Sequence, residues 1–170
     1  MKKIIFSLFT SLIIFSANVY GQDFIKLTGS VVSTDSGASR SVNWIDYDND
    51  NDLDLFISNG LNTGQDNYLY RNDNGTFVKI FNQPVVLDNL PSDGSSWGDY
   101  DNDGLADLFV TNSAGTNHRN YLYKNTGNGS FVKIDTGIAV SEIGNSRGMN
   151  WVDIDNDRDL DIFICREEGR

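Results

Sequence analysis

The sequence predicts an all-β protein built from four-stranded antiparallel sheets, and three observations support this prediction. A phrase of tryptophan followed by alternating aspartates begins at Trp44, Trp97 and Trp151, at spacings of 53 and 54 residues. Short runs of β-branched and aromatic residues follow, and Asn-Gly pairs mark tight hairpin turns. Of the 24 acidic residues 21 are aspartate, which favours turns and loops over helices.

Each complete repeat is predicted to contain four short strands. The first strand ends near the repeated tryptophan, and the other three follow it in order. They cover residues 54–58, 68–71 and 77–80 in one repeat, and 107–111, 121–124 and 131–134 in the next. The second strands read Leu-Phe-Ile and Leu-Phe-Val without alternation, which favours burial on both faces.

Four-stranded units of this length, packed face to face, are typical of β-propeller blades. The third repeat stops after its second strand, and residues 24–27 resemble a fourth strand. We therefore expect an incomplete ring of two full blades and two partial ones, in the N-terminal part of a longer protein or a truncated product. The predicted segments are an outer strand of a preceding blade in 22–40, blades in 41–81 and 94–135, and a truncated blade in 147–170.

Residues 1–21 are predicted to be a secretory signal peptide. Lys2 and Lys3 precede about a dozen apolar residues, and small residues end the segment at Gly21. The apolar run is shorter than the roughly 20 residues of a membrane span, so no span is expected after cleavage. A buried helix or an uncleaved anchor is the alternative. The mature chain, residues 22–170, is thus expected in the periplasm, on the cell surface or outside the cell.

The net charge of −11 argues against nucleic acid and against anionic membranes as partners. Cys165 and His118 are the single cysteine and the single histidine, so they form neither an internal disulfide nor a zinc site. Cys165 takes the place of Ser58 and Thr111 in the other repeats, which predicts a buried free thiol. His118 is expected in a solvated loop.

A nine-residue loop with aspartates at positions 1, 3, 5 and 9 separates the first and second strands of each repeat. These aspartates are Asp46, Asp48, Asp50, Asp54, Asp99, Asp101, Asp103, Asp107, Asp153, Asp155, Asp157 and Asp161. Hard oxygen ligands at alternate positions suit Ca²⁺. Position 7 holds Asp52, Leu105 and Asp159, so its backbone carbonyl is the expected ligand. The sequence predicts up to three calcium ions, whose binding is coupled to folding because the metal-free carboxylates repel one another.

Other interpretations of the loops are weaker. Mg²⁺ demands a stricter octahedron, and an EF-hand is excluded because position 12 is never glutamate and strands flank the loop. A solvated acidic turn is the remaining alternative. Position 6 requires a sharp turn and holds Asn51, Gly104 and Arg158. Arg158 suits such a turn poorly, so the third loop is predicted to bind calcium most weakly.

Aromatic residues recur with the repeat and are predicted to pack. The tryptophans are expected between blades, and one face of the third strands carries Tyr68, Tyr70, Tyr121 and Tyr123. Arg40 and Arg147 each precede a repeat tryptophan by four residues and could meet a ligand at the ring's centre. Asp93 holds the same place in the middle repeat, which favours a structural role for the arginines.

These phrases resemble the FG-GAP, or VCBS, repeat of integrin-α-like β-propellers, most closely the bacterial branch related to cartilage acidic protein and UnbV-type proteins. The resemblance rests on the aspartate loops with their following Leu-Phe or Ile-Phe pairs and on the Tyr-Leu-Tyr-Arg/Lys-Asn hairpins, over about residues 23–165. It implies a seven-bladed ring with Ca²⁺ in loops on one rim. The chain is too short for that ring, and Arg158 replaces the usual glycine.

The leading functional hypothesis is an exported, calcium-stabilised module for adhesion or for binding a protein or carbohydrate ligand. The alternative is part of a secreted propeller enzyme, of the polysaccharide lyase or phospholipase type, whose catalytic residues lie outside this chain. The sequence has no evident nucleophile–base pair and no phosphate loop, so the chain itself is not predicted to be an enzyme.

Overall fold

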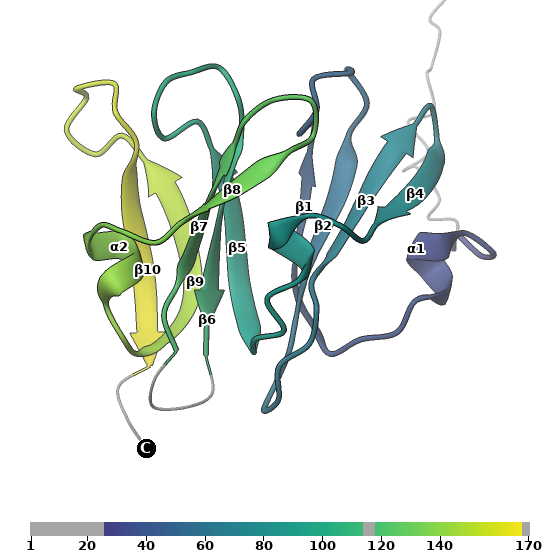
Figure 1. Cartoon of the computed structure of the whole chain (residues 1–170), viewed down its shortest axis with the longest axis horizontal. Helices are drawn as coiled ribbons and strands as arrows, with labels where there is room; N and C mark the ends of the chain where they lie inside the picture. Colours follow the sequence, from purple (N-terminus) through teal and green to yellow (C-terminus); the bar gives the residue numbers. More distant parts are fainter. Residues whose placement is uncertain (1–25, 114–117, 168–170) are drawn as a thin grey trace, which may run out of the picture.

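The computed structural model describes residues 26–113 and 118–167, which form three antiparallel sheets in an open row (Figure 1). The strand orders are β1-β2-β3-β4, β5-β6-β7-β8 and β10-β9. The strands are β1 Ser39–Ile45, β2 Asp54–Asn59, β3 Tyr68–Asp73, β4 Thr76–Ile80, β5 Ser92–Gly98, β6 Asp107–Asn112, β7 Tyr121–Asn125, β8 Phe131–Ile134, β9 Asn145–Val152 and β10 Asp161–Glu167. The all-β prediction and the four-stranded units are confirmed.

Turn chemistry and burial explain why the strands lie where the sequence predicts them. Asn74 and Gly75 have φ of 53° and 90°, as a tight turn between β3 and β4 requires. The register Asp73↔Thr76 closes this hairpin. Every residue of β6 is buried, and so is all of β2 except Ile57, which confirms that these strands are covered on both faces.

Three short helical turns also recur, and the sequence analysis missed them. They are α1 Val31–Thr34, η1 Pro84–Val86 and α2 Ile138–Ser141, and each precedes the first strand of its sheet. Their starting residues are separated by 53 and 54 positions, the period of the repeat. Val85 and Val140 are buried and cover the core beside their sheets. A segment of three or four residues is too short to show a helical period in the sequence.

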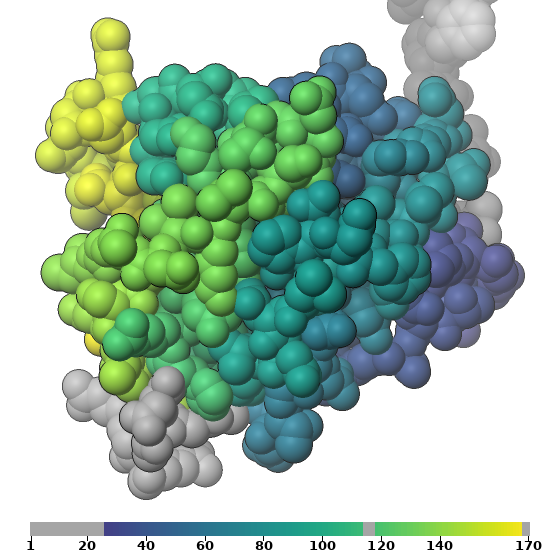
Figure 2. Space-filling model, viewed as in Figure 1, coloured from purple at the N-terminus to yellow at the C-terminus, as the bar shows by residue number. Residues whose placement is uncertain are grey.

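Apolar side chains fill the two spaces between neighbouring sheets, and Figure 2 shows the three units closely packed. Trp97 packs against Phe56 of the first sheet, and Trp151 packs against Phe109 of the second. The prediction that tryptophans pack between sheets is confirmed for these two. It is wrong for Trp44, which is 56% exposed because no described sheet precedes the first one.

Two further expectations differ from the structure. Lys26 and Leu27, the described half of the expected opening strand, lie outside every strand. Cys165 is exposed, although Ser58 and Thr111 at the equivalent places are buried, because no described sheet follows β10.

The predicted signal peptide, residues 1–21, lies outside the described residues. Within the described ranges, no helix has the length and apolar character needed to cross a membrane.

Candidate functional site

The three aspartate loops lie on one rim of the row, because each connects the first strand of a sheet to the second (Figure 1). The loops cover residues 46–54, 99–107 and 153–161. The loops share this position because the three sheets share the same strand order.

The aspartate at position 1 organises each loop. In the first loop, Asp46 accepts hydrogen bonds from the N–H groups of Asp50 and Asn51 at 3.1 and 3.0 Å. Asp99 and Asp153 accept the same two bonds in the other loops at 2.8–3.1 Å. These bonds curl the backbone, so that the following side chains at alternate positions turn toward a common point.

Position 6 has the left-handed backbone that the sequence predicts. The φ angles are 73° at Asn51, 85° at Gly104 and 79° at Arg158. Asparagine and glycine adopt this conformation readily, whereas a residue such as arginine pays roughly 1–2 kcal/mol for it. The third loop therefore carries local strain that the other two avoid.

The aspartate at position 9 ties its loop to the sheet. Asp107 is fully buried and accepts N–H bonds from Tyr100 at 3.2 Å and from Asn125 of β7 at 2.7 Å. Asp54 makes the same two bonds in the first sheet. Asp161 is exposed and accepts the loop bond from Ile154 at 3.1 Å. The sequence analysis treated position 9 as a metal ligand and missed this second role.

In each loop, three carboxylates place an oxygen atom within 4.8 Å of one another. The groups are Asp46, Asp48 and Asp50 in the first loop, Asp99, Asp101 and Asp107 in the second, and Asp153, Asp155 and Asp161 in the third. Asp48 Oδ1 is buried and has no hydrogen-bond partner among the described residues. Three converging carboxylates and an unpartnered oxygen are the donor set that a hard divalent cation requires, so the residues present fit such an ion.

The electrostatics of the loops agree with this donor set. Burial raises the pKa of Asp48, and the neighbouring charges of Asp50 and Asp46 raise it further. Burial also raises the pKa of Asp54 and of Asp107 to about 6, although backbone N–H bonds lower it in part. Burial, with a smaller contribution from the neighbouring carboxylates, therefore opposes the ionisation of these three groups, and a bound cation would offset that penalty.

The second loop already holds a cationic side chain. Lys124 of β7 pairs with Asp101 and, at 2.9 Å, with Asp103. At the equivalent place in the first sheet, Arg71 pairs with Asp73 at 2.8 Å instead, and only its charge reaches the loop, where it lowers the pKa of Asp48 in part. The sequence analysis missed this difference, although Arg71 and Lys124 each follow the repeated Tyr-Leu-Tyr phrase.

The side chains at position 7 lie outside the carboxylate groups. Asp52 accepts a bond from the N–H of Asn74 at 2.7 Å, and Asp159 accepts one from the side chain of Asn102 at 2.9 Å. Leu105 has no carboxylate. The use of a backbone carbonyl at this position stays a prediction. The remaining predicted ligands outside the three groups are Asp54, Asp103 and Asp157.

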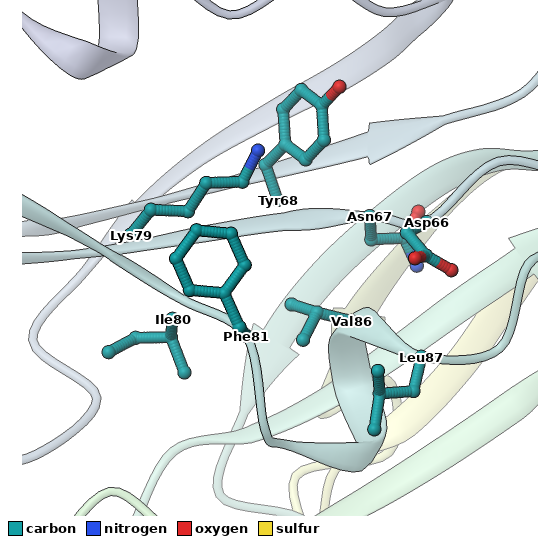
Figure 3. Close-up of a pocket in the computed structure, with 8 residues that line it drawn as sticks. All are labelled: Asp66, Asn67, Tyr68, Lys79, Ile80, Phe81, Val86 and Leu87. Carbon is teal, nitrogen blue, oxygen red and sulfur yellow. The ribbon is translucent and has the colours of Figure 1, made fainter.

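A separate cavity of about 150 Å³ lies beside β3, β4 and η1, and Figure 3 shows Tyr68, Lys79 and Phe81 on its wall. Lys79 lies 3.6 Å from the centre of the Tyr68 ring and pairs with Asp35 at 2.6 Å. In the second sheet, Lys133 repeats this arrangement with Tyr121 and Asp88. Because the same contacts recur in both sheets, we interpret them as structural: they hold the third and fourth strands together and involve none of the loop aspartates.

The comparison with protein families agrees with the repeat. The family model of the FG-GAP-like repeat matches residues 46–110 and, in a second copy, residues 99–164. Both matches begin at the first aspartate of a loop, and together they span more than half of the chain. No curated protein gives a significant match to the chain.

Proposed function

The chain belongs to the family of FG-GAP-like repeat proteins, and on this premise we propose that it is an exported calcium-binding module that presents a rigid propeller-type surface to a protein or carbohydrate ligand. Repeats of this family occur in extracellular or exported proteins and are generally not catalytic. The proposal therefore concerns binding, in adhesion or recognition, and assigns no reaction to the chain.

The observation that carries the calcium proposal is the recurrence of one carboxylate group in three loops. A single acidic turn arises easily on a protein surface, but here three carboxylates converge at the same place in three successive units. Positions 1 and 3 are common to all three groups, and the third member comes from position 5 in the first loop and from position 9 in the other two. Asp46, Asp99 and Asp153 curl their loops with equivalent bonds. Selection for a bound cation accounts for this repetition, whereas a solvated turn does not require it.

Calcium fits the donors better than the other common cations. Carboxylate oxygens are hard ligands, and Ca²⁺ accepts six to eight oxygens in flexible geometry. Zinc prefers nitrogen or sulfur ligands, which these loops lack. The aspartates at positions 1, 3, 5 and 9 would hold the ion together with the carbonyl at position 7. A bound ion supplies positive charge that fixes the loops and couples their order to folding.

Lys124 and Arg158 support a ranking of the three sites. The first loop is free of both features, so we expect it to bind most tightly. In the second loop a cation must displace Lys124 from Asp101 and Asp103. In the third, Arg158 has a strained backbone and is a cationic residue within the loop itself. We therefore expect the first loop to bind most tightly and, as the sequence predicts, the third loop to bind most weakly.

The test is titration calorimetry of Ca²⁺ into residues 22–170, a chain that keeps every described residue. We expect two or three ions to bind with Kd of about 10⁻⁴–10⁻³ M, the range of extracellular modules. The triple variant Asp48→Asn, Asp101→Asn and Asp155→Asn removes one charge from each carboxylate group but keeps the bonds that curl the loops. This variant should lose nearly all binding.

A matched control changes position 7 of the first and third loops. The double variant Asp52→Asn and Asp159→Asn also removes carboxylates, but these side chains lie outside the groups. It should bind Ca²⁺ within about threefold of the wild type, a change of under 1 kcal/mol. A folded wild-type chain that releases no heat with Ca²⁺, or equal loss in both variants, would refute the proposal.

A further inference from the structure

Asn125, the last residue of β7, connects the first aspartate loop to the second. Its side-chain Nδ2 donates to the backbone carbonyl of Tyr47 in the first loop at 2.8 Å. Its backbone N–H donates to Asp107 in the second loop at 2.7 Å. Asn125 is fully buried, so neither bond competes with water for its donor. One residue of the second sheet thus holds groups that belong to two different loops.

Both partners of Asn125 belong to the carboxylate groups or lie between their members. Tyr47 occupies position 2 of the first loop, between Asp46 and Asp48, which are two of the three carboxylates gathered there. Asp107 is itself one of the three carboxylates of the second group. The two candidate calcium sites are therefore connected through a single hydrogen-bonded residue.

Other contacts with the second sheet hold Tyr47 in this place. Tyr47 is 3% exposed, and its ring centre lies 5.7 Å from that of Phe131 in β8. Gly129, in the turn between β7 and β8, packs so closely that a Cβ there would lie 3.1 Å from the Tyr47 ring and 3.7 Å from Cβ of Asp48. Rearrangement of the first loop around an ion would therefore move Tyr47 against the second sheet.

The equivalent asparagine of the first sheet provides a comparison. Asn72 donates its backbone N–H to Asp54 at 2.8 Å, as Asn125 does to Asp107. Each side-chain oxygen accepts an N–H of the following turn, and each Nδ2 donates to the carbonyl at position 8 of its own loop. Of the two, Asn125 alone bonds to a loop of another sheet within the described residues. The pair therefore separates the effect of the connection from the other effects of the asparagine.

We propose that Asn125 couples the first two calcium sites, so that binding in one loop strengthens binding in the other. The inference rests on the proposed calcium binding and adds cooperativity to it. When Asp46 and Asp48 hold an ion, the Tyr47 carbonyl between them is fixed and orders the Asn125 side chain. The backbone N–H of Asn125 then holds Asp107 in place for the second ion, so less order remains to be imposed. By linkage, the second site assists the first by the same factor.

The test compares the calcium affinities of chains in which single sites are disabled. Asp155→Asn removes the third site from every chain and leaves the first two. Adding Asp101→Asn leaves the first site alone, and adding Asp48→Asn instead leaves the second alone. Titration calorimetry of Ca²⁺ into residues 22–170 gives the dissociation constants. We expect their product in the two-site chain to be about fivefold smaller than the product of the two single-site constants, at the low end of the range for coupled sites.

Replacing the two asparagines tests which residue carries the coupling. Asn125→Ala, made in all three chains, should reduce the fivefold difference to less than about twofold. Asn72→Ala loses the same bonds to its own turn and loop and should keep the fivefold difference. A residue with a merely structural role would change stability or single affinities but would leave this ratio unchanged. Circular dichroism in chelator checks that the variants are folded.

A second pair of variants serves if alanine at the buried Asn125 unfolds the chain. Gly129→Ala crowds the Tyr47 ring, whereas Gly75→Ala, at the equivalent place in the first sheet, meets no atom within 4 Å. The two glycines have φ of 68° and 90°, so the backbone strain of alanine is common to both changes. We expect Gly129→Ala to reduce the coupling to less than about twofold and Gly75→Ala to keep it.

The outcomes distinguish this proposal from the calcium proposal. Two single-site chains that bind Ca²⁺, with no difference between the products, would overturn the coupling and leave calcium binding intact. Equal coupling in the two members of either pair of variants would overturn the role of Asn125 and the Tyr47 contact. Absence of Ca²⁺ binding in both single-site chains would overturn both proposals.

Discussion

The second and third sheets begin with nearly the same phrase but differ in what covers them. In the second, between two neighbours, Phe109 and Asp107 are fully buried. In the third, with a neighbour on one side, Phe163 is 65% exposed and Asp161 is also exposed. The same residue types at the same repeat positions thus have opposite environments. Burial in this fold is supplied by adjoining strands and sheets, and the repeat sequence alone does not determine it.

The largest expected difference in stability is between variants of the equivalent phenylalanines Phe109 and Phe163. Phe109→Ala should lower the free energy of unfolding by about 3–5 kcal/mol, because it opens a cavity against Trp151 in the core. Phe163→Ala should cost less than about 1 kcal/mol, since its ring lies mostly in solvent. Urea denaturation measures both. Equal costs would show that the third sheet is as well covered as the second.

The equivalent aspartates at position 9, Asp107 and Asp161, should give the next largest difference in stability. Asp107→Ala leaves the N–H groups of Tyr100 and Asn125 without their partner in a buried place. We expect it to cost about 2–3 kcal/mol, measured in chelator so that metal binding does not contribute. Asp161→Ala, at an exposed carboxylate, should change stability by about 0.5 kcal/mol or less. A similar loss in both would contradict the structural role assigned to Asp107.

At position 6 of the loops, a substitution is expected to raise stability instead of lowering it. Arg158→Gly should raise stability by about 1 kcal/mol, because glycine adopts the left-handed backbone without strain. It should also strengthen Ca²⁺ binding at the third loop by removing a nearby positive charge. The reverse change, Gly104→Arg, should weaken the second loop, with calorimetry and thermal unfolding as measurements. No change in either variant would mean that position 6 does not limit the loops.

A further effect on stability, about as large as that at position 6, concerns Asp93, the carboxylate that connects the middle sheet to both neighbours. Burial alone would raise the pKa of Asp93, but hydrogen bonds from Arg147, Arg40 and Ser113 outweigh it and hold this pKa below its ordinary value. The stabilisation is therefore present above the unfolded-state pKa of about 3.9 and is lost as the pH falls through the lower folded-state value.

Asp93→Asn should accordingly cost about 1 kcal/mol at pH 7, because the ion pairs are partly exposed, and should reduce the loss of stability below about pH 4. Denaturation at pH 7 and at about pH 3 measures this, with Asp135→Asn after β8 as an exposed control. An unchanged acid dependence in Asp93→Asn would show that this carboxylate does not hold the sheets together.

Much of this structure could be predicted because its signals are local. Asn-Gly pairs fix the hairpins, apolar runs mark β2 and β6, and alternating aspartates mark the loops. The failures involve long-range neighbours. The exposure of Trp44 and Cys165 depends on which sheets lie beside them. The bonds of Asp107 depend on β7, a partner that the loop sequence does not reveal.

In the candidate site, too, local features could be predicted from the sequence and long-range contacts could not. The positions of the loop aspartates and the sharp turn at Arg158 follow from spacing alone. The pairing of Lys124 with Asp101 and Asp103 does not, because it brings a strand residue onto a loop about 20 positions earlier. Alignment of the repeats could have indicated it, since Asp73 beside Arg71 has Thr126 as its counterpart.

The strand order has a consequence for the kinetics of folding. Within each sheet every hydrogen-bonded pair of strands is also consecutive in the chain. Loop closure is therefore inexpensive in entropy, and contacts between distant segments are needed only where one sheet meets the next. The first sheet can complete its ladder once Ile80 has left the ribosome, before β5 has emerged from it. Assembly can thus advance during synthesis as successive additions to an existing template.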